Sequence, residues 1–277
     1  MKFAGIIAEY DPFHNGHAWQ LAQAKALGAE RVAVAMSCSL VQRGALPLLP
    51  EAIRTRSALT CGADLVFALP APCACAGAEA FARAGVALLA AAGCDGLVFG
   101  AETPDAALLM EAAELLDSGS YRSALKAQLA GGARSFAAAR QAAAAELASD
   151  ERVAALLDKP NNNLAVEYCR AIRSLAPRME AYPLPRQGAN HGEALHSAHG
   201  QFASASALRK LWAEGGADAV APYVPEAVFP LYQEAYAAGQ YTDFSAAGRC
   251  ELALLRSACR GKAPFADIRG VSEGLEH

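Results

Sequence analysis

The sequence predicts an α/β fold built on a doubly wound parallel sheet with an added helical region. Three observations lead to this prediction. Short apolar runs rich in β-branched residues alternate with helical stretches through the first hundred residues. Each run has the length of a strand that is buried on both faces. A glycine follows each helical stretch, where a left-handed helix cap favours glycine. Strands and helices that alternate at this period form parallel sheets.

The elements follow one another in a regular order. Strands are predicted at Phe3–Ala8, Arg31–Ser37, Asp64–Leu69 and Gly96–Phe99, and helices at Gly16–Leu27, Glu51–Cys61 and Glu79–Ala92, with Gly28, Gly62 and Gly93 as the capping glycines. An alanine-rich region from 105 to 157 has high helix propensity and little bulk, so we expect helices packed beside the sheet. A last strand is predicted near 180–183, followed by a long loop and a helix from about Ser206.

These elements suggest two parts. Residues 1–220 are expected to form the main domain, with a helical insertion at about 105–160, and residues 221–277 a helical accessory region.

Composition and charge exclude several classes of protein. The chain has 277 residues, of which 54% are hydrophobic and 19% are charged, and this is typical of a globular protein. No apolar run reaches the roughly 20 residues of a membrane span, and the apolar amino terminus reads as a buried strand rather than a signal peptide. The formal net charge of −4 shows no basic nucleic-acid footprint. The eight cysteines form no CxxC pair, which favours buried thiols in a cytoplasmic protein over zinc or disulfides.

Two histidines lie where the first predicted strand gives way to the first helix. In "EYDPFHNGHAWQ", His14 and His17 are three residues apart, so both can face one side of the first helical turn. Gly16 lets a ligand approach the backbone between them. A helix amino terminus at the carboxyl edge of a sheet offers free N–H groups and the positive end of the helix dipole. The segment therefore predicts a phosphate cradle, with two structural histidines beside a turn as the alternative.

The spacing matches the HxGH signature of nucleotidylyltransferases, which implies attack on the α-phosphorus of a nucleotide with pyrophosphate leaving. A second phosphate-binding element in such enzymes is a Ser/Thr-rich turn that enters a late helix and ends in arginine. The segment "SASALRK" fits, with Ser204 at the helix start and Arg209 on the next turn. Taken alone, it would be an ordinary capped helix.

A wider resemblance covers essentially the whole chain. The segments "GIIAEYDPFHNGH", "AMSCSLVQRG", "RTRSALTCGADLVFALP", "GLVFGAE", "KPNNNLAVEY", "SASALRK" and "GVSEGLEH" resemble, in this order, the bacterial tRNA(Met) cytidine acetate ligase family. The resemblance implies a Rossmann-like nucleotidylyltransferase fold. It also implies that ATP activates acetate as acetyl-adenylate, and that the acetyl group passes to N4 of the wobble cytidine of elongator tRNA(Met).

The resemblance also implies which residues form the site. His14, His17 and Arg209 would be catalytic, ATP would be held with Mg²⁺ expected beside it, and no protein metal ligand is predicted. The residues expected to bind ATP are Ile7, Ala8, Glu9, Tyr10, Phe13, Asn15, Gly16, Gln20, Gly100, Asn162, Arg186 and Ser204. Gly100 could instead merely end a strand, Asn162 cap a helix and Arg186 be a solvated charge.

A second group of residues is expected near the site. It comprises Ser37, Gln42, Arg43 and Asp64. The histidines of "ANHGEALHSAHG" (His191, His196 and His199) are expected in a loop over the nucleotide rather than in a zinc site.

The chain departs from the family pattern at a few positions. Asp11 stands where the family usually has asparagine, Cys38 where it has glycine and Glu51 where lysine is common. The changes at Asp11 and Glu51 make the region more negative and would weaken ATP binding. The family continues beyond "EGLEH" with a basic segment expected to hold tRNA, so we expect a fragment or a shortened relative. Two other functions stay open: a nucleotidylyltransferase acting on a small metabolite, and an ATP- or RNA-binding module whose catalysis has decayed.

Overall fold

The computed structural model describes residues 1–42, 44–132, 135–185, 196–197 and 200–260. The chain divides into two compact units, Met1–Gln240 and Tyr241–His277. Residues 221–240, which the sequence analysis assigns to an accessory region, fall in the first unit. The described part of the second unit contains α12 (Phe244–Arg260).

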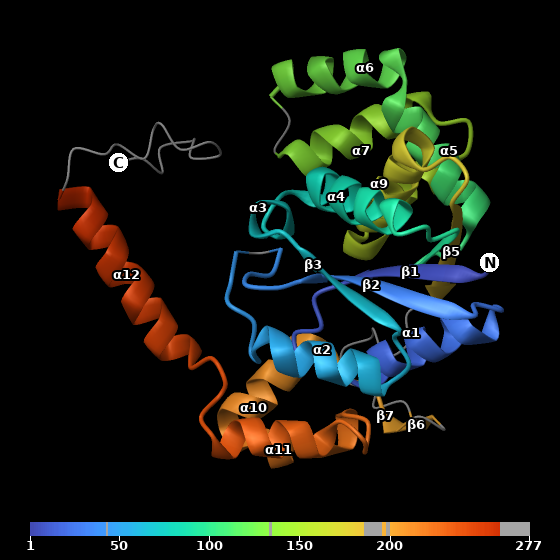
Figure 1. Ribbon diagram of the computed structural model, residues 1–277. Coiled ribbons are helices and arrows are strands. Elements are labelled where there is room, and N and C mark those ends of the chain that lie inside the picture. The colour runs from blue at the N-terminus through green and yellow to red at the C-terminus, as the bar shows by residue number, and fades with distance from the viewer. Residues whose placement is uncertain (43, 133–134, 186–195, 198–199, 261–277) are drawn as a thin grey trace. The chain divides into compact units, whose positions relative to one another are not determined.

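The centre of the first unit is a five-stranded parallel sheet (Figure 1). Its strands are β1 (Phe3–Ala8), β2 (Arg31–Ser37), β3 (Leu65–Leu69), β4 (Gly96–Ala101) and β5 (Glu180–Pro185). The strand order is β3-β2-β1-β4-β5, which confirms the predicted doubly wound sheet. The chain moves outward in one direction from β1 to β3 and in the other through β4 and β5. A crevice is therefore expected where β1 and β4 end side by side.

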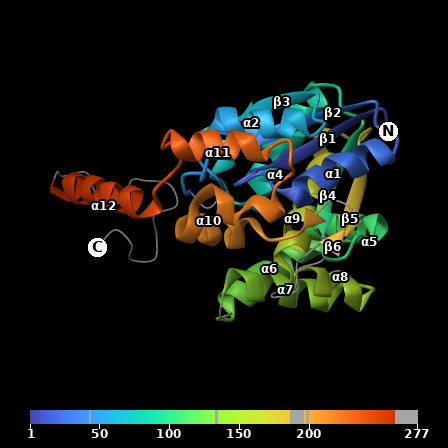
Figure 2. The same ribbon diagram turned by 90° about the horizontal axis from the view of Figure 1, so that it is seen from below.

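Helices cover both faces of the sheet (Figures 1 and 2). One face carries α1 (Asn15–Ala26), α2 (Glu51–Thr60), α10 (Ala205–Ala219), a short 3-10 turn (Ala221–Tyr223) and α11 (Phe229–Ala237). The other carries α3 (Ala71–Ala74), α4 (Ala78–Ala91), α5 (Ala106–Asp117), α6 (Gly119–Ala130), α7 (Phe136–Leu147), α8 (Glu151–Leu156) and α9 (Pro160–Leu175). Each face has its own buried apolar core.

The glycines predicted to follow three helices adopt the expected left-handed backbone. Their φ angles are 97° at Gly28, 106° at Gly62 and 90° at Gly93. A difference from the prediction lies after β5, where β6 (His196–Ser197) pairs antiparallel with β7 (Gly200–Gln201) inside the segment expected to be a loop. None of the helices in the described ranges combines the length and the apolar character needed to cross a membrane.

Two glycines bring α4 close to the central strand. A Cβ atom at Gly85 of α4 would lie 2.5 Å from Ile7 Cδ1, and one at Gly5 of β1 would lie 2.8 Å from Leu89 Cδ1. Real Cβ atoms essentially never approach so closely, so a side chain at either position would displace Ile7 or Leu89 from this packing. The close contact fixes Ile7 at the carboxyl end of β1, where it lines the cavity described below.

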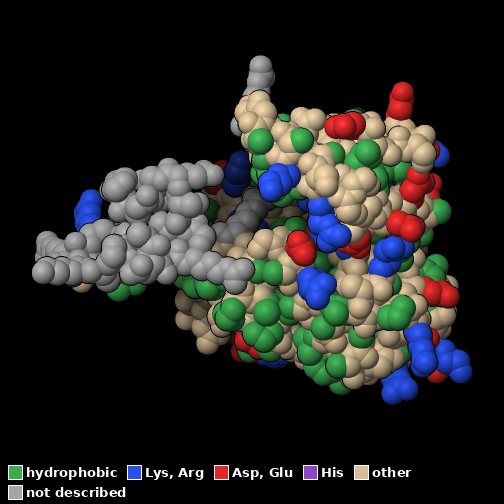
Figure 3. Space-filling view, turned by 90° about the horizontal axis from the view of Figure 1, so that it is seen from above, with side chains coloured by type: hydrophobic (Ala, Val, Ile, Leu, Met, Phe, Trp, Pro, Cys, Tyr) green, Lys and Arg blue, Asp and Glu red, His purple; other side chains and the backbone are tan. Residues whose placement is uncertain are grey.

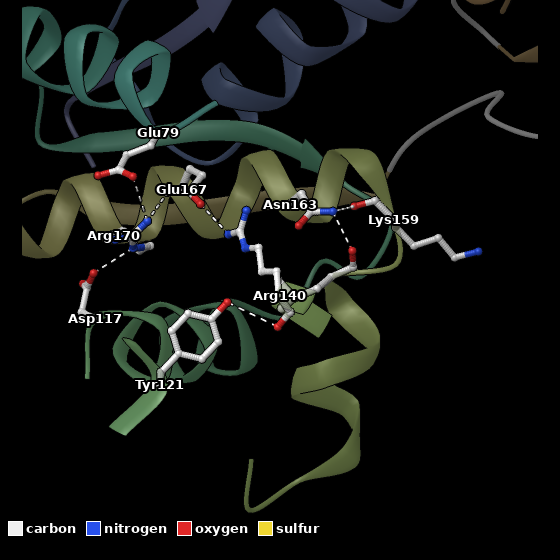
Figure 4. A network of polar contacts seen from close by, with 9 residues as sticks. Glu79, Asp117, Tyr121, Arg140, Lys159, Asn163, Glu167 and Arg170 are labelled. Atoms are coloured by element: carbon white, nitrogen blue, oxygen red, sulfur yellow. Dashed lines mark hydrogen bonds and ion pairs between the residues drawn. The ribbon is translucent and has the colours of Figure 1, made fainter. Parts of the chain in front are cut away.

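The alanine-rich layer is held partly by charges rather than by bulk (Figure 4). The buried residues of α7 are all alanines, Ala139, Ala143 and Ala144. Next to them, the buried carboxylate of Glu167 on α9 pairs with Arg140 of α7 at 2.5 Å and with Arg170 of α9 at 2.7 Å.

The same network reaches α5. Arg170 Nε also donates to Asp117 Oδ1 at 2.8 Å. Burial works against the charge on Arg170, but Glu167 and Asp117 outweigh it and raise the pKa of this guanidinium. The network therefore fastens α5, α7 and α9 together where the small side chains leave little to pack.

Candidate active site

The turn from β1 into α1 presents the two histidines. His14 is the N-cap of α1, with extended backbone at φ −148° and ψ 178°. Its Nδ1 accepts the Gly16 N–H at 3.0 Å, and Nδ1 of His17 accepts the His14 N–H at 3.3 Å. The two imidazoles thus form a reciprocal capping box, a task usually carried out by a hydroxyl and a carboxylate.

These hydrogen bonds assign the same tautomer to both rings. With Nδ1 of each ring as the acceptor, the tautomer is the one that carries its hydrogen on Nε2. The rings are stacked, with centroids 3.8 Å apart and planes inclined by 24°. Two Nε2–H donors are therefore presented together at the positive end of the α1 dipole.

Aromatic residues behind the histidines support this stack. The ring of Tyr10 meets the edge of His17 at 4.8 Å and of Phe13 at 4.9 Å. Tyr10 and Phe13 are both buried, and Tyr10 has a positive φ of 51°, an uncommon backbone conformation for a residue with a side chain. They act as a backing for the imidazoles rather than as walls of the cavity.

A cavity of about 260 Å³ opens in front of the histidines. The carboxyl ends of β1, β4 and β5, the first turns of α1 and α10, and one face of α9 surround it. Its lining comprises Ile7, His14, Gly16, His17, Trp19, Gln20, Phe99, Gly100, Asn161, Leu164, Tyr168, Leu184, Pro185, Ala203, Ser204 and Ala205. The lining combines polar side chains with apolar and aromatic ones, which suits a ligand with both a phosphate chain and a planar base.

Seven of the residues predicted to form the site line this cavity. They are Ile7, His14, Gly16, His17, Gln20, Gly100 and Ser204. The Gln20 side chain also donates to the Val98 carbonyl at 3.1 Å, which ties α1 to β4. Ser204 caps α10 by accepting the Ala207 N–H at 3.2 Å.

Other predicted residues lie in the same turn but do not line the cavity. Ala8 ends β1, the Glu9 carboxylate accepts the Gln42 N–H at 2.7 Å, and the Asn15 amide donates to the Pro222 carbonyl at 3.2 Å. Arg186 and Arg43 are outside the described residues, as are His191 and His199 and the side chain of His196.

Arg209 is directed to the histidine loop. Its Nη1 donates to the Asp11 carbonyl at 2.6 Å and forms an ion pair with Asp11 Oδ2 at 3.1 Å. The other carboxylate oxygen of Asp11, which is buried, accepts the Leu48 N–H at 2.6 Å. Arg209 therefore lies one turn from the cavity-lining Ser204 with its charge partly neutralised.

The amino terminus of α9 meets the carboxyl end of β4. Asn162 is buried, and its Oδ1 accepts the Thr103 N–H at 2.9 Å. The Glu102 carboxylate accepts the Asn162 N–H at 2.7 Å and the Asn161 side-chain amide at 2.5 Å. Asn162 thus fixes the strand end, while its neighbour Asn161 lines the cavity.

Two residues of the second predicted group are placed differently. Ser37 ends β2 at the expected edge but is fully buried. Asp64 precedes β3, where it pairs with Lys25 at 2.7 Å and accepts the Val32 N–H at 2.7 Å. Parallel strands begin at one edge and end at the other, so Asp64 lies at the amino edge of the sheet. The expectation that it belongs to the site is wrong.

Sequence reasoning missed the aromatic wall of the cavity. Trp19 and Phe99 directly precede the predicted residues Gln20 and Gly100, and Asn161, Leu164 and Tyr168 lie on one face of α9 at helical spacing. That spacing was visible in the sequence, but nothing in it indicated which face of α9 meets the carboxyl edge.

Comparisons with known proteins agree with this geometry. A family model described as HIGH Nucleotidyl Transferase matches residues 1–277. The tRNA(Met) cytidine acetate ligase of Syntrophotalea carbinolica is 41% identical over 218 residues, which cover 78% of this chain and 52% of that protein. The protein of the same name from Caldanaerobacter subterraneus subsp. tengcongensis is 34% identical over 285 residues, covering 100% of this chain and 69% of that protein.

Solved structures show the same similarity. Thermotoga maritima TmcAL in its apo form is similar with a TM-score of 0.86 and 31% identity, covering 100% of this chain and 66% of that one. The same protein bound with alpha-thio ATP is similar with a TM-score of 0.78 and 30% identity, covering 87% and 57%. The chain spans between about half and about two thirds of the length of these relatives. On the match over its whole length, the chain belongs to the HIGH nucleotidyl transferase family and, within it, to the tRNA(Met) cytidine acetate ligases.

Proposed function

We propose that this protein activates acetate with ATP and transfers the acetyl group to N4 of the wobble cytidine of elongator tRNA(Met). In the first step an acetate oxygen attacks the α-phosphorus, giving acetyl-adenylate and pyrophosphate. In the second the cytidine amine attacks the acetyl carbon, loses a proton and releases AMP. These substrates would place the protein in the cytoplasm.

The single observation that carries the proposal is the pair of Nε2–H donors at the amino terminus of α1. Both imidazoles line the cavity, and their Nδ1 atoms are already used by the backbone. The pair is therefore oriented before substrate arrives, and such donors stabilise charge that develops on phosphate oxygens. The structure of a relative bound with alpha-thio ATP supports a nucleotide as the ligand.

The remaining roles follow from position. The apolar lining around Phe99 and Tyr168, whose ring centroids lie 5.4 Å apart, would hold the adenine, and Ser204 and Arg209 at the start of α10 would approach the phosphates. Among the described lining residues there is no carboxylate. Mg²⁺ would therefore be held mainly by the phosphates of ATP rather than by protein ligands. Arg186 and Asn162 remain proposed nucleotide contacts.

The test is acetate-dependent exchange of labelled pyrophosphate into ATP, measured with and without tRNA. Exchange that requires acetate supports the proposal. Exchange that requires a phosphorylated metabolite instead would identify a metabolite nucleotidylyltransferase, and ATP binding without any exchange would identify a binding module.

His17→Ala makes this test specific to the site. The variant should lower kcat for exchange about a hundredfold, which corresponds to about 2.7 kcal/mol, while ATP affinity changes little, because the donor acts mainly in the transition state. Equal losses in kcat and affinity would contradict this role.

A further inference from the structure

The loop that presents the histidines is held by the carbonyl oxygens of alternate residues. The carbonyl of Glu9 accepts from Arg54 Nη1 at 2.7 Å. The carbonyl of Asp11 accepts from Arg209 Nη1 at 2.6 Å. The carbonyl of Phe13 accepts from the Tyr232 hydroxyl at 2.7 Å. We call these three bonds the carbonyl clamp.

The donors of the carbonyl clamp come from three different helices. They belong to α2, α10 and α11, which lie on the same face of the sheet as α1 (Figure 1). The segment from residue 9 to residue 14 is neither strand nor helix, so no regular ladder satisfies its backbone. Buried carbonyls need partners, and here the partners also fix the path of the chain.

Of the three bonds, the one to the Phe13 carbonyl is next to the histidine pair in the sequence. The next residue is His14, whose N–H donates to the His17 ring and whose own ring accepts from Gly16. Rotation of the peptide between Phe13 and His14 would turn the His14 N–H away from the His17 ring. The Tyr232 hydroxyl donates to the carbonyl of that same peptide and so opposes this rotation.

Tyr232 is itself firmly placed. It is fully buried, and its ring meets the edge of Trp212 with centroids 6.0 Å apart. Burial raises the pKa of its hydroxyl far above the usual range, so it remains a donor at every working pH. It does not line the cavity.

We propose that Tyr232 is a positioning residue for the histidine pair, acting through the Phe13–His14 peptide from a part of the chain more than two hundred residues away. The expected effect of Tyr232 on catalysis rests on the proposed function, whereas its expected effect on the orientation of the imidazoles does not. On this proposal, α11 contributes a residue that positions the two histidines.

Tyr232→Phe tests the proposal because it removes one oxygen and keeps the ring. Tyr121→Phe is the matched control, since Tyr121 is also buried and its hydroxyl donates to a main-chain carbonyl, that of Arg140, at 3.3 Å in the helical layer (Figure 4). Both variants are compared at a temperature at which urea unfolding shows them fully folded.

The first readout is independent of the reaction. Spectra of ¹⁵N-labelled histidine side chains, assigned with His14→Gln and His17→Gln, report which ring nitrogen carries hydrogen. We expect Tyr232→Phe to shift the His14 and His17 signals away from the Nε2–H pattern, and Tyr121→Phe to leave them unchanged. Wild-type signals in Tyr232→Phe would overturn the proposal, whatever reaction the protein performs.

The second readout is acetate-dependent pyrophosphate exchange. Tyr232→Phe should lower kcat about tenfold, with the KM for ATP within about twofold of wild type, because a misaligned donor pair affects the transition state more than binding. Tyr121→Phe should keep kcat. An equal fall of kcat in both variants would show that Tyr232 acts only through stability, and would also overturn the proposal. Absence of exchange in the wild type would refute the proposed function alone, because the histidine spectra would still decide the role of Tyr232.

Discussion

Replacing Gly16 with alanine separates the catalytic importance of the histidine turn from its importance for folding. A Cβ atom at this position would lie 2.8 Å from Cε1 and 3.0 Å from Nδ1 of His14. Contacts this short force the imidazole to move by several tenths of an ångström. The ring cannot move without weakening its bond to the Gly16 N–H and its stacking on His17.

The magnitudes predict opposite sensitivities for stability and activity. Loss of the His14 cap should cost about 1 kcal/mol of unfolding free energy. Replacing glycine by alanine in a helix returns up to about 1 kcal/mol, so the net change in stability should be small. A displaced catalytic group can lower the rate about a hundredfold, equivalent to about 2.7 kcal/mol of activation free energy.

The assay combines urea unfolding with acetate-dependent pyrophosphate exchange. Gly119→Ala is the control, because Gly119 also lies in the first turn of a helix, α6, and a Cβ atom there would meet nothing within 4 Å. We expect wild-type exchange from Gly119→Ala and nearly none from Gly16→Ala. Near-normal exchange by Gly16→Ala would refute the conclusion that the position of the His14 ring is critical.

Three further predictions concern charge. Asp11→Asn should strengthen ATP binding several-fold in calorimetry, because the Arg209 charge is released while the amide oxygen can still accept from Leu48; an unchanged Kd would contradict this. Partial burial raises the pKa of Asp95, but hydrogen bonds from two backbone amides at the start of β1 outweigh it and hold that pKa below 3.8. Wild type should therefore exceed Asp95→Asn in free energy of unfolding by a constant amount above about pH 4, and this difference should shrink as the pH falls further. Urea titrations at several pH values would measure it. With a net charge of −4 and basic and acidic side chains interspersed on the face in Figure 3, residues 1–277 should bind elongator tRNA(Met) weakly even at low salt in gel-shift experiments. Tight, salt-sensitive binding would place an RNA surface on this region.

The local chemistry of the sequence was enough to predict the sheet. β1 and β2 have the predicted bounds, because each coincides with one continuous apolar run. β4 and β5 each continue two residues beyond the prediction, since Gly100 and Ala101 pair with Leu184 and Pro185. Proline is tolerated there because β5 is an edge strand and needs fewer N–H donors.

The candidate site was predictable where function depends on a motif that is continuous in sequence. His14, Gly16 and His17 fall within four residues, and their spacing alone specifies one face of a helical turn. The partners of that turn come from α2, α10 and α11, and no periodicity reveals which residue of a distant helix reaches it. Tyr232 was therefore not predicted, although it lies within a helix that was expected.

Helix α9 connects the cavity with α7, a helix that does not line it. One face carries Asn161, Leu164 and Tyr168 against the cavity, and the other carries Glu167, bound to Arg140 of α7. Neighbouring alanines offer α7 little else to hold it. Substitution of Arg140 would remove one partner of the buried Glu167 carboxylate on the helix that carries part of the cavity lining. A residue of α7 that does not line the cavity can thus influence its shape.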